Sequence, residues 1–129
     1  MRAIERAKTK ATERGVDVRF VVADALRLAD LGEQFDTVLD CGLFHVLEDG
    51  ERVRYVASLT EVVRPGGRFH MLCFSDRQPG NVWPRRVTQD EIRDAFSVGW
   101  EVESIEPAVS VLAYDPAGAL AWQVVAARK

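Results

Sequence analysis

Metal-ligand clusters, long apolar runs and basic tracts are all absent from this sequence. Only two cysteines and two histidines occur in 129 residues, and without a Cys-x-x-Cys or a close histidine pair they argue against a metal site. No segment approaches the roughly 18 consecutive apolar residues of a membrane span. The net charge of −3 and the lack of a basic run disfavour nucleic acid as a partner.

Glycine-rich phosphate-binding turns are absent as well. Without any Gly-x-Gly, the sequence has neither a dinucleotide-binding fingerprint nor a P-loop. The N-terminal residues 1–14 mix charge with alanine and lack the apolar core of a signal peptide. We therefore expect a cytoplasmic protein in which the two thiols, Cys41 and Cys73, are reduced.

What is present is the composition of one folded domain. Hydrophobic residues make up 47% of the chain and charged residues 29%, which is typical of a globular protein. No repeat or linker divides the sequence, so we expect a single domain over residues 1–129.

Helix and strand patterns alternate along the chain. The helical pattern occurs at 3–14 and 50–64, and a Thr88/Glu91 capping box opens a third helix that Gly99 ends. The expected strands are 18–23, 36–41, 68–74, 100–105 and 120–126. Turn residues at 115–118 predict that the last two strands pair antiparallel. This order predicts an α/β fold with a mostly parallel sheet and an antiparallel C-terminal strand pair.

Ligands of such sheets bind beyond the carboxyl ends of the strands, which selects three places here. The first is Asp24, followed by Ala25 and Leu26. A carboxylate there can accept hydrogen bonds from an amino group on a bound ring, while the neighbouring apolar residues leave room for the ring to lie flat. The alternative is a simple helix or turn cap, and the spacing alone favours the cap.

The second place is the segment from Asp40 to His45. Asp40 is a polar residue inside the otherwise apolar end of its strand, where an unpaired carboxylate would be unfavourable, and Cys41 and Gly42 follow it. Phe44 and His45 are expected to project over the same rim. The alternative is that His45 hydrogen-bonds the backbone while Phe44 packs in the core.

The third place is the polar loop 75–86, which contains Trp83 and Arg85. It could form a lid or bind an anionic substrate, or it could be a solvated loop whose tryptophan folds onto the core. The preceding string at 64–67, Arg-Pro-Gly-Gly, has the residues needed to end a helix and turn into a strand.

The order of these motifs resembles that of the class I S-adenosylmethionine-dependent methyltransferases, especially the small-molecule group that includes thiopurine and thiol methyltransferases. The resemblance rests on residues 18–25 (Val-Arg-Phe-Val-Val-Ala-Asp-Ala), 35–45 (Phe-Asp-x-Val-Leu-Asp-Cys-Gly-x-x-His) and 59–67 (Leu-x-x-Val-x-Arg-Pro-Gly-Gly). The segment from Thr88 to Trp100 and the closing strand pair look similar too, so the resemblance covers nearly the whole chain.

The resemblance implies S-adenosylmethionine as cofactor and a small molecule as methyl acceptor. It places Asp24 at the adenine amino group with Ala25 and Leu26 beside the ring, and the segment Asp40-Cys41-Gly42 beside the methionine part. It also implies that His45 is the candidate base, and that the substrate lies near Phe44, Trp83 and Arg85.

This chain departs from the family at its N-terminal side. The family's first strand, Gly-x-Gly turn and ribose-binding carboxylate have no counterpart here, so we expect a truncated, partial domain that is weak or inactive alone. The rival is a non-catalytic remnant that dimerises or docks on a partner, for example as a homodimer that covers an exposed sheet edge. A flavodoxin-like receiver is a weaker rival, because no acidic pair follows a first strand.

Overall fold

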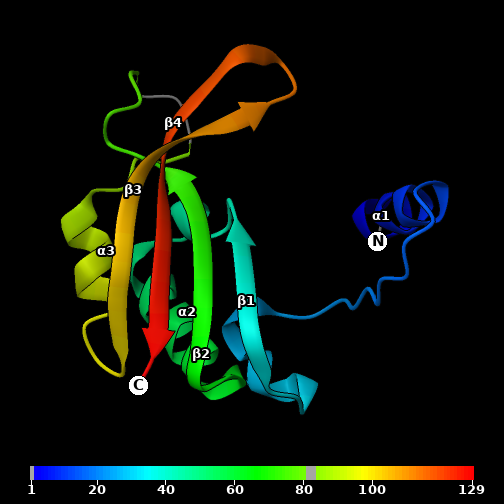
Figure 1. Cartoon of the computed structure of the whole chain (residues 1–129), viewed down its shortest axis with the longest axis horizontal. Coiled ribbons are helices and arrows are strands. Elements are labelled where there is room, and N and C mark those ends of the chain that lie inside the picture. The colour runs from blue at the N-terminus through cyan, green and yellow to red at the C-terminus, as the bar shows by residue number, and fades with distance from the viewer. Residues whose placement is uncertain (1, 81–83) are drawn as a thin grey trace.

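A four-stranded mixed sheet forms the centre of the protein (Figure 1). The computed structural model describes residues 2–80 and 84–129. The strands, in the spatial order β1-β2-β4-β3, are β1 (Phe35–Cys41), β2 (Val63–Phe74), β4 (Asp115–Arg128) and β3 (Trp100–Leu112). β1 and β2 pair parallel, whereas β4 pairs antiparallel with both β2 and β3. The predicted α/β fold with an antiparallel C-terminal strand pair is confirmed, and the parallel part is the β1–β2 pair.

Two α-helices cover one face of this sheet. The helical segments are α1 (Arg2–Glu13), η1 (Ala25–Leu31), η2 (Phe44–Val46), α2 (Asp49–Val62) and α3 (Gln89–Ala95). α2 and α3 lie behind the sheet in Figure 1. Alternate residues of β2, namely Phe69, Met71 and Cys73, are buried with the apolar side of α2. No helix in residues 2–80 and 84–129 is long and apolar enough to span a membrane.

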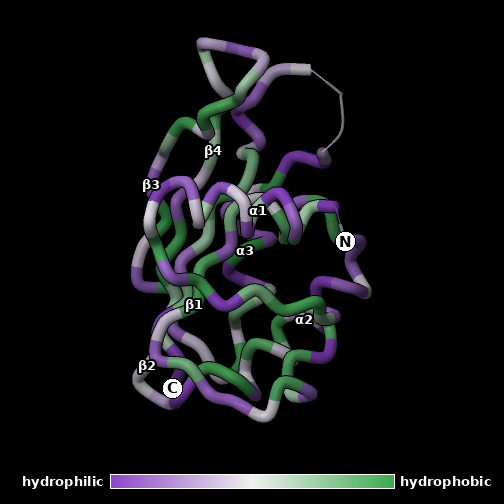
Figure 2. Tube along the Cα trace, turned by 90° about the vertical axis from the view of Figure 1, so that its right-hand side faces the viewer, coloured by the Kyte–Doolittle hydropathy of each residue, from purple (hydrophilic) through white to green (hydrophobic). Residues whose placement is uncertain are grey.

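Aromatic side chains fill the space between the sheet and the helices. Phe69 stacks on Phe96 with ring centroids 5.5 Å apart, and Trp100 meets Phe96 edge-on at the same distance. The Trp100 indole N–H donates to Thr60 on α2, which satisfies its one polar atom inside the core. In Figure 2 the strands carry hydrophobic stretches together with hydrophilic residues, and the alternate burial of residues along β2 identifies the face that packs on the helices.

The capping box before α3 was predicted correctly, whereas two helices end earlier than expected: α2 ends at Val62, before Pro65, and α3 ends at Ala95, before Gly99. Thr88 accepts from the Glu91 backbone N–H while the Glu91 side chain accepts from the Thr88 backbone, so the capping box is complete. Gly67 follows α2 in the Arg-Pro-Gly-Gly string, and a Cβ there would lie 2.8 Å from the Asp36 carbonyl oxygen. Glycine is therefore required where the chain enters the sheet beside β1.

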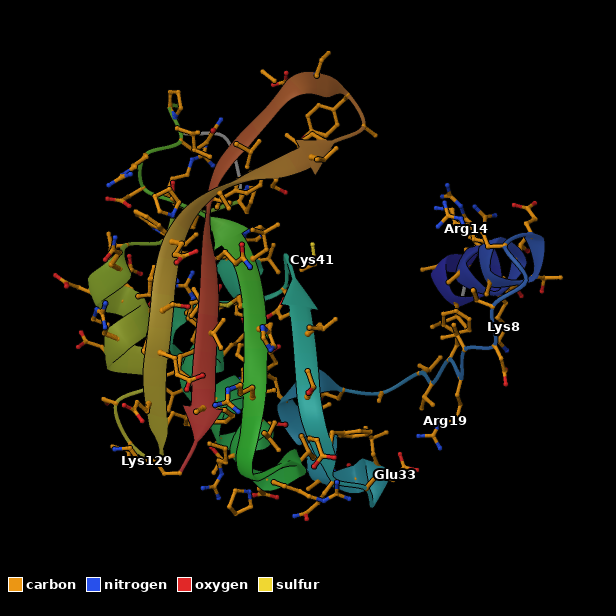
Figure 3. All side chains as sticks on the ribbon, in the orientation of Figure 1. Lys8, Arg14, Arg19, Glu33, Cys41 and Lys129 are labelled. Atoms are coloured by element: carbon orange, nitrogen blue, oxygen red, sulfur yellow. The ribbon has the colours of Figure 1, made fainter. Side chains whose placement is uncertain are left out.

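The expected strand at 18–23 is wrong. Residues 16–24 belong to no strand and are exposed except for the half-buried Phe20, and Figure 1 shows α1 standing away from the sheet at their far end. Val22 is 60% exposed. An ion pair between Arg19 and Glu33 joins this segment to the residues just before β1 (Figure 3). The valine-rich sequence has strand propensity, but a strand forms only where a neighbour accepts its hydrogen bonds, and the described residues supply none.

The expected turn at 115–118 is also misplaced. The chain reverses at 113–114, and β3 and β4 extend well beyond the predicted strands. The turn residues instead form an irregularity within β4: the Asp115 side chain accepts from the Ala117 N–H, and Gly118 has a φ of +71°. A Cβ at Gly118 would lie 2.6 Å from the Ser110 carbonyl oxygen, so glycine permits the close approach of the two strands here.

Candidate functional site

The turn after β1 is organised by the buried carboxylate of Asp40. Its Oδ1 accepts from the Leu43 N–H at 2.8 Å, and its Oδ2 accepts from the Phe44 N–H at 3.3 Å and from the Tyr55 hydroxyl at 2.9 Å. Burial, followed by the charge of Asp40 and this bond, raises the pKa of Tyr55, so the phenol stays a donor. Both oxygens of Asp40 thus bond within the chain, and this residue shapes the turn.

His45 completes the hydrogen bonding of β2 at the same turn. Its Nδ1 accepts from the backbone N–H of Phe74 at 2.9 Å, and its ring meets the Phe74 ring edge-on with centroids 4.8 Å apart. Burial lowers the pKa of His45, and the charges of Arg52 and Arg86 add to this effect while Asp40 opposes it. The alternative of a histidine bonded to the backbone is therefore what the structure contains.

A small cavity of about 250 Å³ adjoins this turn. Its lining is mostly apolar and comes from the β1 turn, the end of β2, Pro84 and the β3–β4 hairpin: Cys41, Gly42, His45, Val46, Leu72, Cys73, Phe74, Pro84, Ser110 and Leu112. Figure 3 shows Cys41 at the carboxyl end of β1. Burial raises the pKa of Cys73 to about 12, so that thiol is protonated and unreactive at neutral pH. Cys41 is exposed, against the expectation of a core thiol.

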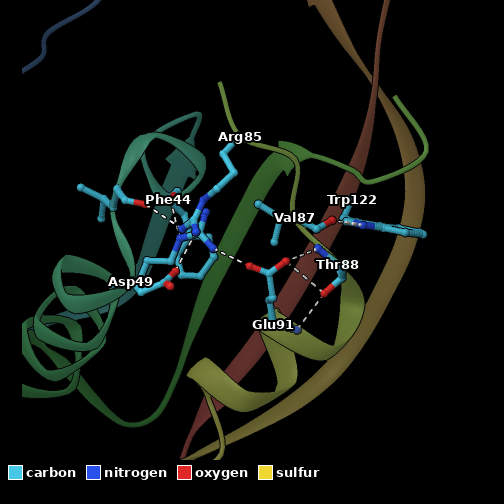
Figure 4. Close-up of polar contacts among 9 residues, drawn as sticks. Phe44, Asp49, Arg85, Val87, Thr88, Glu91 and Trp122 are labelled. Carbon is cyan, nitrogen blue, oxygen red and sulfur yellow. Dashed lines mark hydrogen bonds and ion pairs between the residues drawn. The ribbon is translucent and has the colours of Figure 1, made fainter. Parts of the chain in front are cut away.

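Phe44 points away from this cavity. Its side chain is fully buried and packs on Phe96 with centroids 6.3 Å apart, so the expected projection of Phe44 over the rim is wrong. The Arg52 guanidinium lies 4.5 Å from the Phe44 ring centroid, donates to the Phe44 carbonyl and pairs with Glu91 at 3.0 Å. Figure 4 shows how these contacts connect the turn to α3. Phe44 and Arg52 are therefore buried behind the turn and hold it in place, but they do not line the cavity.

Residues of the loop 75–86 contact the protein itself. Arg85 donates to the Asp49 carboxylate at 2.8 Å and to the Leu47 carbonyl at 3.2 Å, which fixes it against the start of α2. Arg86 donates to the carbonyl oxygens of Gln78, Pro79 and Pro84, so it holds the loop in shape. The predicted substrate residue Trp83 lies outside the described residues.

Asp24 lies at the surface and caps η1. Its Oδ1 accepts from the Leu26 N–H at 2.9 Å, which is the cap that the spacing favours, and Ala25 and Leu26 are half-buried against the core. Asp24 does not line the cavity beside Gly42. The structure thus brings Cys41, Gly42 and His45 together at the cavity and leaves the predicted ring-binding residues apart from it, at the start of η1. The described residues hold no group of three or more potential metal ligands.

Two supporting residues escaped the sequence reasoning. Tyr55 and Arg52 both lie on α2, and nothing in their local pattern marks them as partners of Asp40 and Phe44. Their only signal is a polar side chain on the side of a helix that faces the sheet, which can be seen only after the helix has been placed.

Known proteins resemble this chain in both sequence and structure. Residues 1–67 match the family described as a methyltransferase domain. The 2-heptyl-1-hydroxyquinolin-4(1H)-one methyltransferase of Mycobacteroides abscessus is 34% identical over 109 residues, which are 82% of this chain and 48% of that enzyme. An uncharacterized methyltransferase of Schizosaccharomyces pombe is 32% identical over 75 residues, or 58% of this chain and 52% of the yeast protein. The chain thus spans about half the length of the curated relatives it matches.

Solved structures agree with this assignment. A structure from work on the conversion of a disulfide bond into a thioacetal group during echinomycin biosynthesis matches with a TM-score of 0.80 and 32% identity, and the match covers 98% of this chain and 62% of that one. A Methanosarcina mazei S-adenosylmethionine-dependent methyltransferase has the same fold, with a TM-score of 0.78 at 15% identity over 98% of this chain and 77% of that one. The chain therefore belongs to the class I S-adenosylmethionine-dependent methyltransferase family.

Proposed function

We propose that this chain takes part in transferring a methyl group from S-adenosylmethionine to a small-molecule acceptor. The observation that carries the proposal is the turn from Asp40 to His45, which borders an apolar cavity at the carboxyl end of β1. Ligands of open α/β sheets bind at this end. Family membership then supplies the reaction class.

The residues present fit part of the cofactor. Asp24 keeps an exposed carboxylate at the start of η1, where it can accept from the adenine amino group. Gly42 has a φ of +95° and no side chain, so the methionine part can approach the backbone of the turn closely. Asp40 contributes by holding this turn, since its own oxygens already accept three hydrogen bonds.

The reaction asks mainly for positioning. In an in-line displacement, a lone pair of the acceptor bonds to the methyl carbon while the sulfonium sulfur keeps the electrons of the broken S–C bond and becomes a neutral thioether. An acceptor that arrives protonated must also release a proton. The turn, the cavity and Gly42 are the parts of this chain that would orient the two reactants.

A flat heteroaromatic acceptor suits the cavity best. The name of the Mycobacteroides abscessus relative gives a hydroxyquinolinone as its substrate. The cavity of this chain has a mostly apolar lining with one imidazole at its edge, which can hold a ring by apolar contact and one of its polar atoms by a hydrogen bond.

We expect this chain to bind the cofactor weakly when it is alone. The sequence has no Gly-x-Gly turn, and the resemblance to the family gives no counterpart of the ribose-binding carboxylate, so the adenine and methionine contacts would have to hold the cofactor. Each tenfold loss of affinity corresponds to about 1.4 kcal/mol, and the loss of several polar contacts amounts to orders of magnitude.

The outer edge of β1 favours a second function, as a dimerisation or partner-binding module. In the described residues β1 pairs only with β2, and Leu39 on β1 is 76% exposed. An unpaired edge strand with an exposed leucine can add a strand from a second copy, which would form a homodimer, or from another protein.

Calorimetric titration with S-adenosylhomocysteine tests the main proposal. The folded chain should bind, Asp24→Ala should weaken binding severalfold, and the control Asp94→Ala, an exposed acid on α3, should leave it unchanged. Acceptor screening by mass spectrometry would then follow. If a folded chain binds no S-adenosylhomocysteine but sediments as a dimer, the second function replaces the first.

A further inference from the structure

The hydrogen-bond ladder between β1 and β2 stops at His45. The last backbone hydrogen bond to β2 from this side comes from Gly42, the residue after β1, whose N–H donates to the Leu72 carbonyl at 3.1 Å. Parallel ladders use alternate residues of each strand, so the next rung would use the N–H of Phe74. The chain turns away at Gly42, and Nδ1 of His45 accepts from that N–H instead, at 2.9 Å.

This contact fixes which ring nitrogen carries the proton. An N–H donor needs a lone pair opposite it, so Nδ1 of His45 must be unprotonated and the neutral ring carries its proton on Nε2. The other tautomer and the imidazolium would both direct a second N–H at the Phe74 N–H and leave two donors facing each other.

The Nε2 side of the ring lies beside Gly42, and both residues line the cavity. A Cβ built on Gly42 would lie 3.4 Å from Nε2, in van der Waals contact, so glycine leaves this side of the ring open. Nε2 donates to no residue within 2–80 or 84–129. It is also not one of the fully buried polar atoms without a partner in that part of the chain, which are Arg52 Nη2 and Arg85 Nε. Nε2–H is therefore a donor that a molecule in the cavity can reach.

The surroundings keep His45 neutral. Burial is the largest influence and lowers its pKa, and the positive charges of Arg52 on α2 and Arg86 in the following loop act in the same direction. Among the described residues, the negative charge of Asp40 on β1 opposes them. The cavity wall adds only two thiols, those of Cys41 and Cys73, beside apolar groups and Ser110.

We propose that His45 is a fixed hydrogen-bond donor that binds the methyl acceptor through Nε2–H, and that the acceptor class is a small apolar ring carrying a carbonyl or oxyanion. This inference rests on the proposed function. It gives His45 a role different from the base that the family resemblance implies, since neither nitrogen of the neutral ring has a lone pair available to the cavity. An acceptor served by this site must already be unprotonated or must lose its proton to water.

The tautomer can be read directly by long-range proton–nitrogen NMR of the histidine-labelled chain at neutral pH. The chain has two histidines, so a His70→Asn variant assigns the signals of His45. Nδ1 should give the signal of an unprotonated nitrogen and Nε2 that of a protonated one. A proton on Nδ1 would overturn the inference whatever the chain binds or methylates.

Ligand binding tests the acceptor class with a matched pair of bicyclic probes. Quinolin-4(1H)-one has a carbonyl acceptor, whereas indole has a ring N–H and no acceptor of this kind. Quinolin-4(1H)-one should shift the Nε2 signal, and His45→Asn, which keeps an acceptor for the Phe74 N–H but loses the donor, should weaken its binding about tenfold. His45→Gln carries an amide N–H to the position of Nε2 and should restore part of that binding. Indole should bind the wild type and His45→Asn alike.

The outcomes separate this inference from the proposed function. Equal affinity of quinolin-4(1H)-one for the wild type and His45→Asn, or no binding of this probe, would overturn the acceptor assignment even in a chain that binds S-adenosylhomocysteine. A donor at Nε2 that binds the probe in a chain with no affinity for S-adenosylhomocysteine would support the site and contradict methyl transfer.

Discussion

Replacing Tyr55 with phenylalanine removes one hydroxyl from the turn that forms the candidate site. That hydroxyl donates to Oδ2 of Asp40 at 2.9 Å, and both residues are buried, with Asp40 only 6% exposed. The ring of Tyr55 would keep its edge-on contact with Phe69, whose centroid is 6.2 Å away, so the substitution tests the polar contact alone.

The size of the effect follows from what Asp40 retains. A hydrogen bond to a charged group contributes about 1.5–3 kcal/mol, and a buried carboxylate that loses every donor loses more. Asp40 would still accept from the N–H groups of Leu43 and Phe44. We therefore expect Tyr55→Phe to lower the free energy of unfolding by about 2 kcal/mol.

Urea denaturation followed by circular dichroism measures this difference. Tyr114→Phe is the matched control, because Tyr114 is 83% exposed in the β3–β4 turn, and its free energy of unfolding should stay within about 0.5 kcal/mol of the wild type. The midpoint should shift for Tyr55→Phe with little change in slope. An effect of Tyr55→Phe as small as that of the control would refute the assignment of Asp40 and Tyr55 as a structural pair.

Three further predictions test other parts of the chain. Gly67→Ala should destabilise the chain by about 1–3 kcal/mol in urea denaturation, because its Cβ would meet two backbone carbonyl oxygens at 2.8 and 2.9 Å. The control is Gly50→Ala, whose Cβ would meet nothing within 4 Å and which should be neutral or mildly stabilising. A harmless Gly67→Ala would contradict the close packing of the strand entry. Thr88→Ala should lower stability by about 1 kcal/mol, since it removes the cap of α3, and an unchanged midpoint would show that α3 needs no cap. Burial lowers the pKa of His45, so as the pH falls the unfolded state binds a proton at this residue before the folded state does. The free energy of unfolding should therefore be highest with respect to His45 above about pH 6.5, the ordinary pKa of histidine, and should decrease as the pH falls below it. Thermal melts from pH 7.5 to about 5 should show a smaller decrease for His45→Asn, and equal slopes would mean that His45 titrates as it does in the unfolded chain.

Features set by neighbouring residues could be predicted from the sequence. The strand at β1, the capping box at Thr88 and the glycine at 67 depend on patterns within a few positions, and all three occur as expected. The prediction of a strand at 18–23 is wrong because its valines give the segment only a propensity for strand, whereas a strand also needs a second strand to pair with. The turn predicted at the Asp-Pro-Ala-Gly string is misplaced because the same residue types also suit an irregularity within a strand, which here lies next to the actual turn.

Contacts across the fold lay beyond the sequence for a different reason. The bonds of Asp40 to Tyr55 and of His45 to the Phe74 N–H join residues 15 and 29 positions apart, and no local pattern indicates which polar groups will face each other. The sequence did indicate that several unlike groups gather after β1. Which of them turn inward, as Phe44 does, and which reach the cavity depends on how α2 lies against the sheet.

The position of β4 has a consequence for synthesis of the chain. β4 follows β3 in the sequence but lies between β2 and β3 in the sheet. β3, and the edge of β2 that faces away from β1, therefore stay unpaired until residues 115–128 have been made. On the ribosome, β1 and β2 can pair early, whereas Trp100 and the rest of β3 must wait with apolar surface exposed. Translation that pauses between β3 and β4 would therefore prolong the state in which nascent chains need a chaperone, and the sheet closes only when its last strand inserts at its centre.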